Sequence, residues 1–575
     1  MQSIPWLKGK FHVPESLWRK HQYLELYPLD GGTSFIVDEF VGTRDDREIT
    51  ERLASGKLLE KWGKPGDMEW TRHGEAKNME LYAWLHRWYY IPSVARMYFL
   101  EHKEAHAELV FRILDDWVRK MGYPKTREEA YALEEKALAF DYKHQRSLLP
   151  SLEEHCPWEW FDFQPAYRLL VLLVTAQLLK ESRVMQKRSR EMLEWIVGHA
   201  NATYWITEKF GFKRGNHHSL RMMSLYLAGE HIEHDNAEGW RRTALEMQER
   251  HAREDYFEDG MCKESLPGYF PFIVTHVREV LLSAKANGRE IPGRFEETVR
   301  KALGLMKAMV MPDGFLPVIN DGPRVNIRGM IDLIEHYYPS GKDAVKAFMV
   351  NKASGFPIFH DKRNYLVFNV NYSPAGHVQA GKLGIILWRD DEPFVIEAGC
   401  CNYDNPDFQP YFRRGWAHST LLVDGEEDGV WKAFWVWEQL ARPEIKEFSE
   451  GERPFVRVES DGFKRMGIRF ERKIEQHDAD SFVITDEIRN EMKKERTFTF
   501  RFMLAQEDVK KDSKKNEVRI RGKKNTLTIR ASKDAEIEVK RVKSNFFGDM
   551  REVPCVDFVL KSAGDFTQSF ELRFS

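Results

Sequence analysis

One segment of the chain places polar and titratable residues where a helical pattern begins. It reads Lys213-Arg-Gly-Asn-His-His-Ser219, and the apolar pattern of a helix follows it. Backbone N–H groups and the helix dipole attract an anion to such an N-terminus, and Lys213 and Arg214 strengthen that attraction. The segment also has a purely structural interpretation, in which Asn216 or Ser219 caps the helix.

Three later segments could move protons or bind an acidic group. A Gly/Pro-rich loop over residues 259–272 holds Tyr269, His377 precedes a strand pattern, and Arg413 and Arg414 lie together before another strand. A phenol and an imidazole can exchange protons with a substrate, and arginine binds a carboxylate through two parallel hydrogen bonds. Taken singly, Tyr269 is also explained as a packed aromatic residue and His377 as a structural histidine.

Helical periodicity extends from the start of the chain to about residue 355. Leu109, Ile113, Leu114 and Trp117 share one helix face, and residues 169–174 are apolar all round, as in a buried helix. Similar patterns recur at 79–100, 184–200, 216–229, 238–252, 272–286, 294–310 and 329–350. Short connections between them predict antiparallel helical hairpins. Without a strict repeat, we expect residues 1–355 to form an irregular helical toroid rather than a regular solenoid.

Alternation of polar and apolar residues replaces this period after about residue 355. It is clearest at 497–502, 517–521, 526–530 and 536–540, and residues 383–388 and 394–398 form a further predicted strand pair. Such strands have one face in a core and one in water, which predicts an antiparallel β-sandwich over residues 356–575. The basic run at 510–515 is interpreted as a solvated hairpin loop.

The composition excludes several classes of protein. The 575 residues are 42% hydrophobic and carry 87 Lys+Arg against 90 Asp+Glu, for a net charge of -3. That balance argues against nucleic acid as a partner, and no apolar run approaches the ~20 residues of a membrane span. The N-terminus lacks the pattern of a secretory signal and the five cysteines are sparse. We therefore expect a cytoplasmic protein with reduced thiols.

Together and in this order, these segments resemble the heparinase II/III-like polysaccharide lyases, which include exo-acting oligoalginate lyases. The resemblance covers most of the chain, from about Trp70 onward. Its most specific part runs from Gly376-His-Val-Gln379 through Glu397-Ala-Gly399 to Ala417-His-Ser-Thr-Leu-Leu-Val-Asp-Gly425. The resemblance implies an (α/α) toroid, or incomplete barrel, followed by an antiparallel β-sandwich, with the active site in the cleft between them.

The same resemblance implies β-elimination next to a uronic acid. This reaction needs a group that neutralises the carboxylate, a base for C5–H and an acid for the leaving oxygen. Asn216 and His217 match the family's neutralising pair. Tyr269 matches its catalytic tyrosine, and His377 matches its base for the opposite sugar epimer. The residues expected to contact substrate are Arg214, Glu264, Tyr411, Arg413 and Arg414.

No cofactor is required for this chemistry, but family members often hold a structural zinc ion in the sandwich. The matching positions here are Gln379, Glu397 and His418. An amide is a poor zinc ligand. Three outcomes remain open: a weakened site, an oxygen-preferring ion, or a hydrogen bond from Gln379 to Glu397.

The sequence thus predicts a lyase that cleaves an acidic oligosaccharide or polysaccharide to a 4,5-unsaturated uronide, exolytic on imported oligosaccharides. A glycoside hydrolase on a helical toroid is the main alternative, because Asp259, Glu264, Asp313 and Asp321 lie in loop-like contexts. A non-catalytic carbohydrate-binding protein is the other. The sequence leaves the uronic acid, endo or exo action, and a homodimer open.

Overall fold

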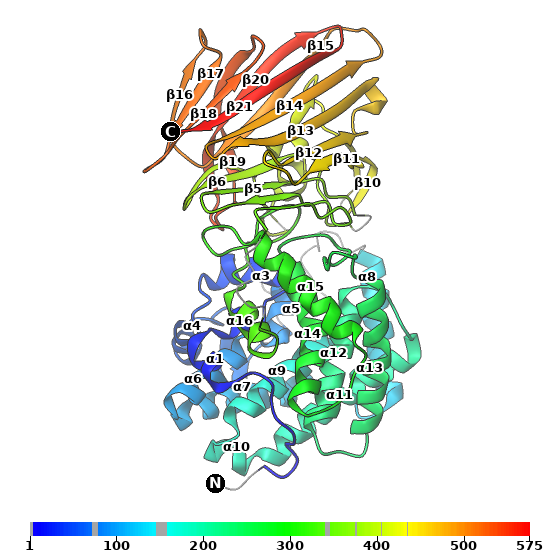
Figure 1. Ribbon diagram of the computed structural model, residues 1–575. Helices are drawn as coiled ribbons and strands as arrows, with labels where there is room; N and C mark the ends of the chain where they lie inside the picture. The colour runs from blue at the N-terminus through cyan, green and yellow to red at the C-terminus, as the bar shows by residue number, and fades with distance from the viewer. Residues whose placement is uncertain are drawn as a thin grey trace. The chain divides into compact units, whose positions relative to one another are not determined.

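The computed structural model describes residues 4–71, 79–144, 158–160, 162–339, 346–373, 376–403, 405–433 and 435–575 (Figure 1). The chain divides into two compact units. The helical unit consists of residues up to 256 together with 271–300 and 328–339. The β unit consists of residues 257–270, 301–327 and 340–575. Neither unit is therefore a single continuous stretch of chain.

The helical unit holds nearly all of the helices. They are α1 (Glu15–Lys20), α2 (Tyr23–Leu26), α3 (Gly31–Ile36), α4 (Asp46–Ala54), α5 (Met79–Arg87), α6 (Tyr90–Glu101), α7 (Glu104–Met121), α8 (Arg127–His144), α9 (Gln164–Leu179), α10 (Arg183–Lys187), α11 (Ser189–Phe210), α12 (Asn216–His231), α13 (Ala237–Glu254), α14 (Phe270–Ala286), α15 (Arg294–Met309), which continues into the β unit, and α16 (Arg328–Tyr337). A two-stranded ribbon, β1 (Gly63–Lys64) and β2 (Asp67–Met68), accompanies them. None of the described helices is long and apolar enough to cross a membrane.

The predicted helices are present, with three corrections to their bounds. The pattern at 184–200 is two helices, α10 and α11, with a break at Arg188. Helix α9 is buried on all sides, as its apolar run predicts, and it packs against α6, α11 and α12. The pattern at 79–100 is two helices, because the chain breaks at Trp88, whose φ of 60° is left-handed. The helix expected at 329–350 ends at Tyr337, and Phe348–Met349 is a strand.

Two antiparallel sheets form most of the β unit. One has the order β11-β12-β13-β14-β21-β18-β17-β16 and the other β19-β20-β15-β7-β6-β5-β4-β3, with β8 beside β15. The strands are β3 (Phe348–Met349), β4 (Ile358–His360), β5 (Asn364–Phe368), β6 (Ile385–Arg389), β7 (Glu392–Ile396), β8 (Leu421–Val423), β11 (Glu444–Ser449), β12 (Phe455–Ser460), β13 (Ile468–Asp478), β14 (Ser481–Asn490), β15 (Arg496–Leu504), β16 (Asp508–Asp512), β17 (Glu517–Arg521), β18 (Thr526–Ala531), β19 (Glu536–Ser544), β20 (Arg551–Ser562) and β21 (Phe566–Phe574). A separate ribbon pairs β9 (Gly429–Ala433) with β10 (Val436–Leu440).

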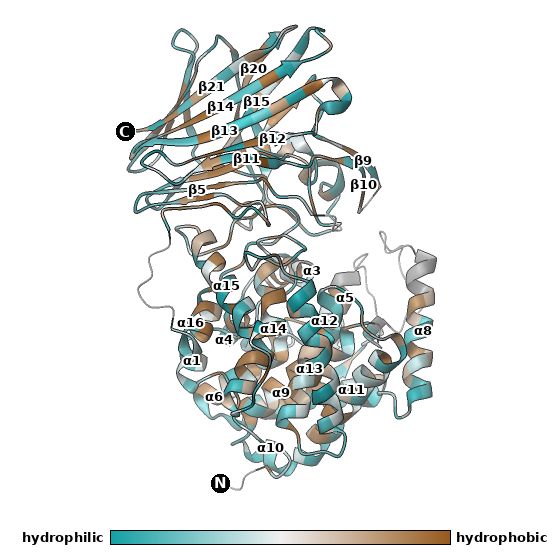
Figure 2. Ribbon diagram, turned by 45° about the vertical axis from the view of Figure 1, so that its right-hand side comes forward, coloured by the Kyte–Doolittle hydropathy of each residue, from teal (hydrophilic) through white to brown (hydrophobic). Residues whose placement is uncertain are grey.

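The two large sheets share one hydrophobic core. Phe500 of β15 contacts Phe570 of β21 with ring centroids 5.3 Å apart, so the inner faces of the two sheets meet. The outward residues are polar, and Figure 2 shows the resulting bands along strands such as β13. The predicted helical part followed by an antiparallel β part is confirmed. The basic run is corrected, because Lys510 and Lys511 belong to edge strand β16.

Two excursions from the helical half of the sequence pack within the β unit. In the first, Asp259 accepts hydrogen bonds from the backbone N–H and hydroxyl of Ser354, at 3.0 and 2.7 Å. In the second, the Asp321 N–H donates to the carbonyl of His377 at 3.1 Å. The units thus divide the chain differently from the simple division at 355 and 356. This arrangement brings Tyr269 and Asp321 into the same unit as His377.

Candidate active site

Three aromatic side chains of the β unit meet at one point. The phenol oxygens of Tyr269 and Tyr403 are 2.5 Å apart, within one hydrogen bond. The His377 ring lies 5.0 Å from the Tyr269 ring and 5.9 Å from the Tyr403 ring, measured between centroids. Trp435 contacts His377 edge-on at 4.6 Å. Two phenols and an imidazole in mutual contact form a cluster that can hold and transfer protons.

The two phenols of this cluster are not equivalent. Tyr403 is held in its protonated form, because burial and then the charges of Tyr269 and Asp321 raise its pKa well above the ordinary value. A protonated Tyr403 can donate its hydrogen bond to the oxygen of Tyr269, and such a donor stabilises a phenolate. The pair therefore makes Tyr269 the phenol better suited to lose a proton.

The fully buried carboxylate of Asp321 lies next to the His377 ring. Asp321 accepts a hydrogen bond from the Gln379 amide at 2.8 Å, and its second oxygen lies 3.5 Å from Arg413 Nε and 3.8 Å from His377 Nδ1. Arg413 in turn donates to the carbonyls of Gly376 and Val378, at 2.5 and 2.9 Å. Both ends of the His377 turn are thus tied to one Asp–Arg pair.

Asn216 and His217 occupy the first turn of α12 in the helical unit. Gly215 is the N-cap, at a φ of 107° that suits glycine, and no side chain caps the helix. The expectation that Asn216 or Ser219 is the cap is therefore wrong, and Ser219 instead accepts from Gln248 at 3.0 Å. Asn216 is buried with 9% exposed, whereas His217 is exposed.

An acidic partner fixes the His217 ring. Its Nδ1 lies 2.5 Å from Asp162 Oδ2, and the ring packs on Phe163 at 3.9 Å between centroids. Burial opposes ionisation of Asp162, but the charges of His217 and Arg221 outweigh it and lower the pKa of that carboxyl. Because Nδ1 of His217 contacts Asp162, the other ring nitrogen, Nε2, faces away from Asp162.

A buried relay of hydrogen bonds lies beneath the same turn. His218 contacts His251 at 2.7 Å, and the other nitrogen of His251 contacts Asp255 at 2.5 Å. Asp255 also accepts from the N–H of Gly215 at 3.3 Å. Burial and the nearby charges of Arg221 and His251 lower the pKa of His218 to about 2, so it is neutral. This relay holds the turn that carries Asn216.

Family comparisons cover nearly the whole chain. Residues 43–345 match the heparinase II/III N-terminus, and residues 345–572 match the heparinase II/III-like C-terminal domain. The chain belongs to the heparinase II/III family. Members of this family are polysaccharide lyases, and this chain is therefore an enzyme of that class. None of the curated proteins compared with the sequence matches it.

Several solved structures share the fold of this family member. A heparinase III crystal structure has a TM-score of 0.71 at 15% identity, covering 97% of this chain and 93% of its own. A heparinase III gene product has a TM-score of 0.68 at 15% identity, with coverages of 93% and 84%. Heparan sulfate lyase HepC from Pedobacter heparinus has a TM-score of 0.64 at 17% identity, with coverages of 97% and 86%.

The residues predicted to contact substrate have varied positions in this family member. Arg214 is exposed and pairs with Glu254, and Glu264 is half-buried beside Cys262, whose pKa burial and then Glu264 raise. Arg413 is fully buried, so direct binding of a substrate carboxylate by its guanidinium does not fit the structure. The phenol of Tyr411 donates to the Lys543 carbonyl at 2.8 Å.

The predicted metal positions include only two strong ligands. His418 Nδ1 lies 2.5 Å from Glu397 Oε2, and Gln379 donates to Asp321 rather than to Glu397. Buried atoms of all three, His418 Nε2, Glu397 Oε1 and Gln379 Oε1, have no hydrogen-bond partner among the described residues. No described group of three or more His, Cys, Asp or Glu side chains is arranged to hold a metal. The imidazole nitrogen and the carboxylate oxygen are donors that zinc accepts, whereas the amide oxygen is a poor zinc ligand.

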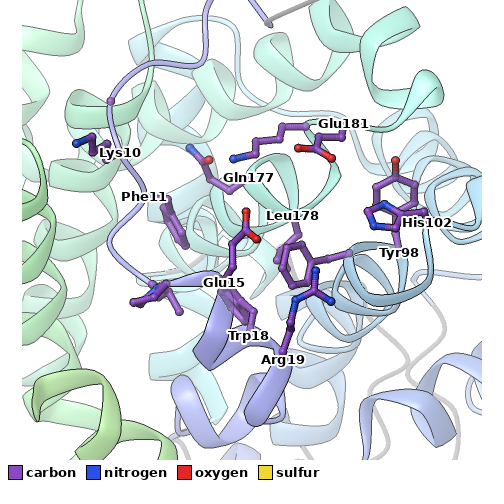
Figure 3. Close-up of a pocket in the computed structure, with 15 residues that line it drawn as sticks. Lys10, Phe11, Glu15, Trp18, Arg19, Tyr98, His102, Gln177, Leu178 and Glu181 are labelled. Carbon is purple, nitrogen blue, oxygen red and sulfur yellow. The ribbon is translucent and has the colours of Figure 1, made fainter. Parts of the chain in front are cut away.

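A pocket of ≈ 530 Å³ in the helical unit is separate from all of these residues. The N-terminal segment forms one wall, and Figure 3 shows Gln177, Glu15 and Arg19 around it. None of the residues that the sequence singles out as functional lines it.

The described cysteines, Cys262, Cys400, Cys401 and Cys555, are free and buried, and Cys156 lies outside the described residues.

Sequence reasoning missed Tyr403, a member of the active-site cluster, and Trp435, which packs on that cluster. Tyr403 follows Asn402 in a loop without periodicity, and only its distance to Tyr269 marks it. Nothing in the sequence distinguishes Trp435 from the rest of the 17 tryptophans. Asp321 was noticed only as a carboxylate for the hydrolase alternative. Its Asn-Asp-Gly context signals a turn, and nothing in that context shows that it is buried against Arg413.

Proposed function

We propose that this lyase cleaves the glycosidic bond next to a uronic acid by β-elimination and releases a 4,5-unsaturated uronide. The substrate class is a glycosaminoglycan-type or related acidic oligosaccharide. The single observation that carries the proposal is the contact of Tyr269 with both Tyr403 and His377. An elimination requires a base and an acid at one sugar, and this cluster supplies both without a carboxylate pair.

In the proposed reaction, Tyr269 acts as a phenolate stabilised by the hydrogen bond from Tyr403. It takes the proton from C5, and the electron pair of the C5–H bond becomes the C4–C5 double bond as the C4–O bond breaks. The departing oxygen takes a proton from the Tyr269 phenol, which restores the phenolate. His377 is the proposed base for the opposite epimer, in which C5–H points to the other face of the sugar.

The proposal assigns Asn216 and His217 to the carboxylate of the same sugar. A C5 proton is weakly acidic while that carboxylate is fully charged, so donors that bind it lower the barrier. Burial of Asn216 supports this role, since a partly desolvated amide forms a stronger hydrogen bond to an anion. The contact with Asp162 supports it for His217, because it holds the imidazole ring in one orientation.

The hydrolase alternative has less support. Two carboxylates must flank the bond in that chemistry. Asp321 is fully buried, Asp259 binds Ser354, and Asp313 is paired with Arg324. These three acidic groups hold loops of the β unit, and the fourth candidate, Glu264, is half-buried beside Cys262.

We further propose that the enzyme is exolytic on imported oligosaccharides and needs no cofactor for the chemistry. A divalent ion held by Gln379, Glu397 and His418 would have a structural role. It would bind the buried oxygen and nitrogen atoms that lack partners among the described residues. That role would be local to the β unit, where Gln379 follows His377 by two positions.

The test is an absorbance assay with purified protein and a panel of acidic oligosaccharides. A lyase product gains ultraviolet absorbance from its conjugated double bond, whereas a hydrolase product gains only reducing ends. Tyr269→Phe should keep the fold and lose at least ~10²-fold in rate. Reducing ends without absorbance, or normal turnover by Tyr269→Phe, would contradict the proposal.

A further inference from the structure

The ribbon of β9 and β10 belongs to neither large sheet, and it carries exposed tryptophan. Among the described strands, these two pair only with each other, and Figure 2 shows them beyond β11. Trp431 of β9 is 36% exposed and Val436 of β10 is 50% exposed. The exposed part of each side chain adds nothing to the stability of the fold through burial. The packing of the sandwich therefore does not explain why Trp431 and Val436 are partly exposed on this ribbon.

Two further side chains extend Trp431 into a preorganised surface. The Arg414 guanidinium lies 4.5 Å from the ring centroid of Trp416 and 5.5 Å from that of Trp431. We call Trp431, Trp416 and Arg414 the tryptophan platform. Cation–π contacts of this kind hold the rings and the guanidinium in one arrangement. A platform already ordered loses little entropy when a ligand binds.

A buried carboxylate locks the guanidinium in place. Glu427, which is 1% exposed, accepts from Arg414 Nε at 2.7 Å and from the N–H of Gly415 at 2.5 Å. Arg414 Nη2 also lies 2.5 Å from this carboxylate. Nη1 of Arg414 makes no hydrogen bond or ion pair within the described residues, and the side chain is 19% exposed. The Nη1 edge of the Arg414 guanidinium therefore has free N–H donors next to the indole rings of Trp416 and Trp431.

The ribbon links this platform to the active-site cluster. Trp431 is the direct cross-strand partner of Trp437, whose indole N–H donates to the Val378 carbonyl at 2.9 Å. Trp435 lies two residues earlier, about 7 Å along an extended chain, and contacts His377 and Tyr403 at 4.6 and 5.2 Å. A chain-like substrate that reaches His377 can therefore continue over the same ribbon.

We infer that the tryptophan platform is a second saccharide subsite, which binds a sugar of the substrate beyond the bond that is cleaved. An indole face packs on the apolar face of a sugar ring while hydroxyls remain in water. The free edge of Arg414 donates to a hydroxyl, carboxylate or sulfate of that sugar. The inference rests on the proposed function, because it takes the occupant of the His377 cluster to be an acidic oligosaccharide.

A size series of acidic oligosaccharides tests the platform in the full-length protein. Trp431→Ala should raise KM about tenfold for a hexasaccharide, and it should raise KM less than ~2-fold for the shortest oligosaccharide that is cleaved. Trp431→Phe should restore most of the affinity. Val539→Ala removes an exposed apolar side chain of β19 and is the control. Equal KM changes at all lengths, or none, would overturn the inference.

Calorimetry separates this inference from the proposed function, and sedimentation tests whether the surface binds a second copy of the chain. If the wild type forms no unsaturated product, the proposed function fails, and calorimetry with the same oligosaccharides decides the subsite alone. Weaker binding by Trp431→Ala then supports the platform, and unchanged binding overturns it. Sedimentation tests the other occupant: a change of oligomeric state in Trp431→Ala would show that the face binds a second copy.

Discussion

The phenol oxygens of Tyr269 and Tyr403 lie 2.5 Å apart, although the two residues are separated by 134 positions in the chain. Burial keeps Tyr403 protonated, which leaves it as the donor. An isolated tyrosine is a poor base near neutral pH, since its ordinary pKa is about 10. A fixed phenol donor is one way in which this enzyme can make Tyr269 act as a base.

Tyr403→Phe is therefore expected to lower kcat about 10- to 100-fold. The pH–rate profile should also move to higher pH, because the Tyr269 phenolate loses its donor. Rates of product absorbance between pH 6 and 10 measure both effects. Tyr365→Phe is the control, since it removes a buried phenol that donates to the Met309 carbonyl. A profile unchanged by Tyr403→Phe would contradict the pairing.

Asn216→Ala is expected to lower kcat by about 10²-fold, with a smaller change in KM. A donor to the developing charge acts mainly in the transition state. Asn236→Ala, which removes an exposed asparagine that donates to Asn201, is the matched control. Initial rates at several substrate concentrations separate the two constants. An unchanged kcat would show that Asn216 does not neutralise the carboxylate.

The sequence predicts most secondary structure here because each half follows one period. Helix α12 and strand β17 lie where the spacing of apolar residues places them. The ends are less predictable. The left-handed φ at Trp88 divides one helical pattern, and the ring of this residue is fully buried against Trp117. Tertiary packing can override local helix preference in this way.

The active-site cluster was only partly predictable, for a different physical reason. Tyr269 and His377 lie in recognisable motifs, but Tyr403 has no local signal, since its partner is distant in sequence. Tyr411, eight residues later, was expected to contact substrate, and its phenol donates to the Lys543 carbonyl instead. Long-range contacts between loops depend on how whole units fold, which periodicity does not reveal.

Asp321→Asn should destabilise the protein by on the order of 3 kcal/mol, because it removes the charge paired with fully buried Arg413. It should also lower kcat, since the His377 turn is held by the same pair. Asp313→Asn is the control, and its half-buried pair with Arg324 should be worth less than about 1 kcal/mol. Urea unfolding measures both. Equal losses in the two variants would contradict the supporting role of Asp321.

A second buried carboxylate, Glu134 of α8, adjoins the partner of His217. It accepts from the N–H of Asp162 at 3.0 Å. Burial, and also the charge of Asp162, raise the pKa of Glu134 to about 7. The native state therefore binds a proton between about pH 4.5 and pH 7 that the unfolded chain releases. Stability should fall as pH rises through this window.

Glu134→Gln should remove this pH dependence, because an amide carries no charge at any pH. At pH 8 we expect the variant to be more stable than the wild type by up to about 3 kcal/mol, and at pH 5 we expect little difference. Urea unfolding at both pH values measures the two differences. Glu135→Gln, next in the chain and paired with Lys209 at the surface, should change stability by less than about 1 kcal/mol. The same difference between Glu134→Gln and wild type at both pH values would show that Glu134 does not titrate in this window.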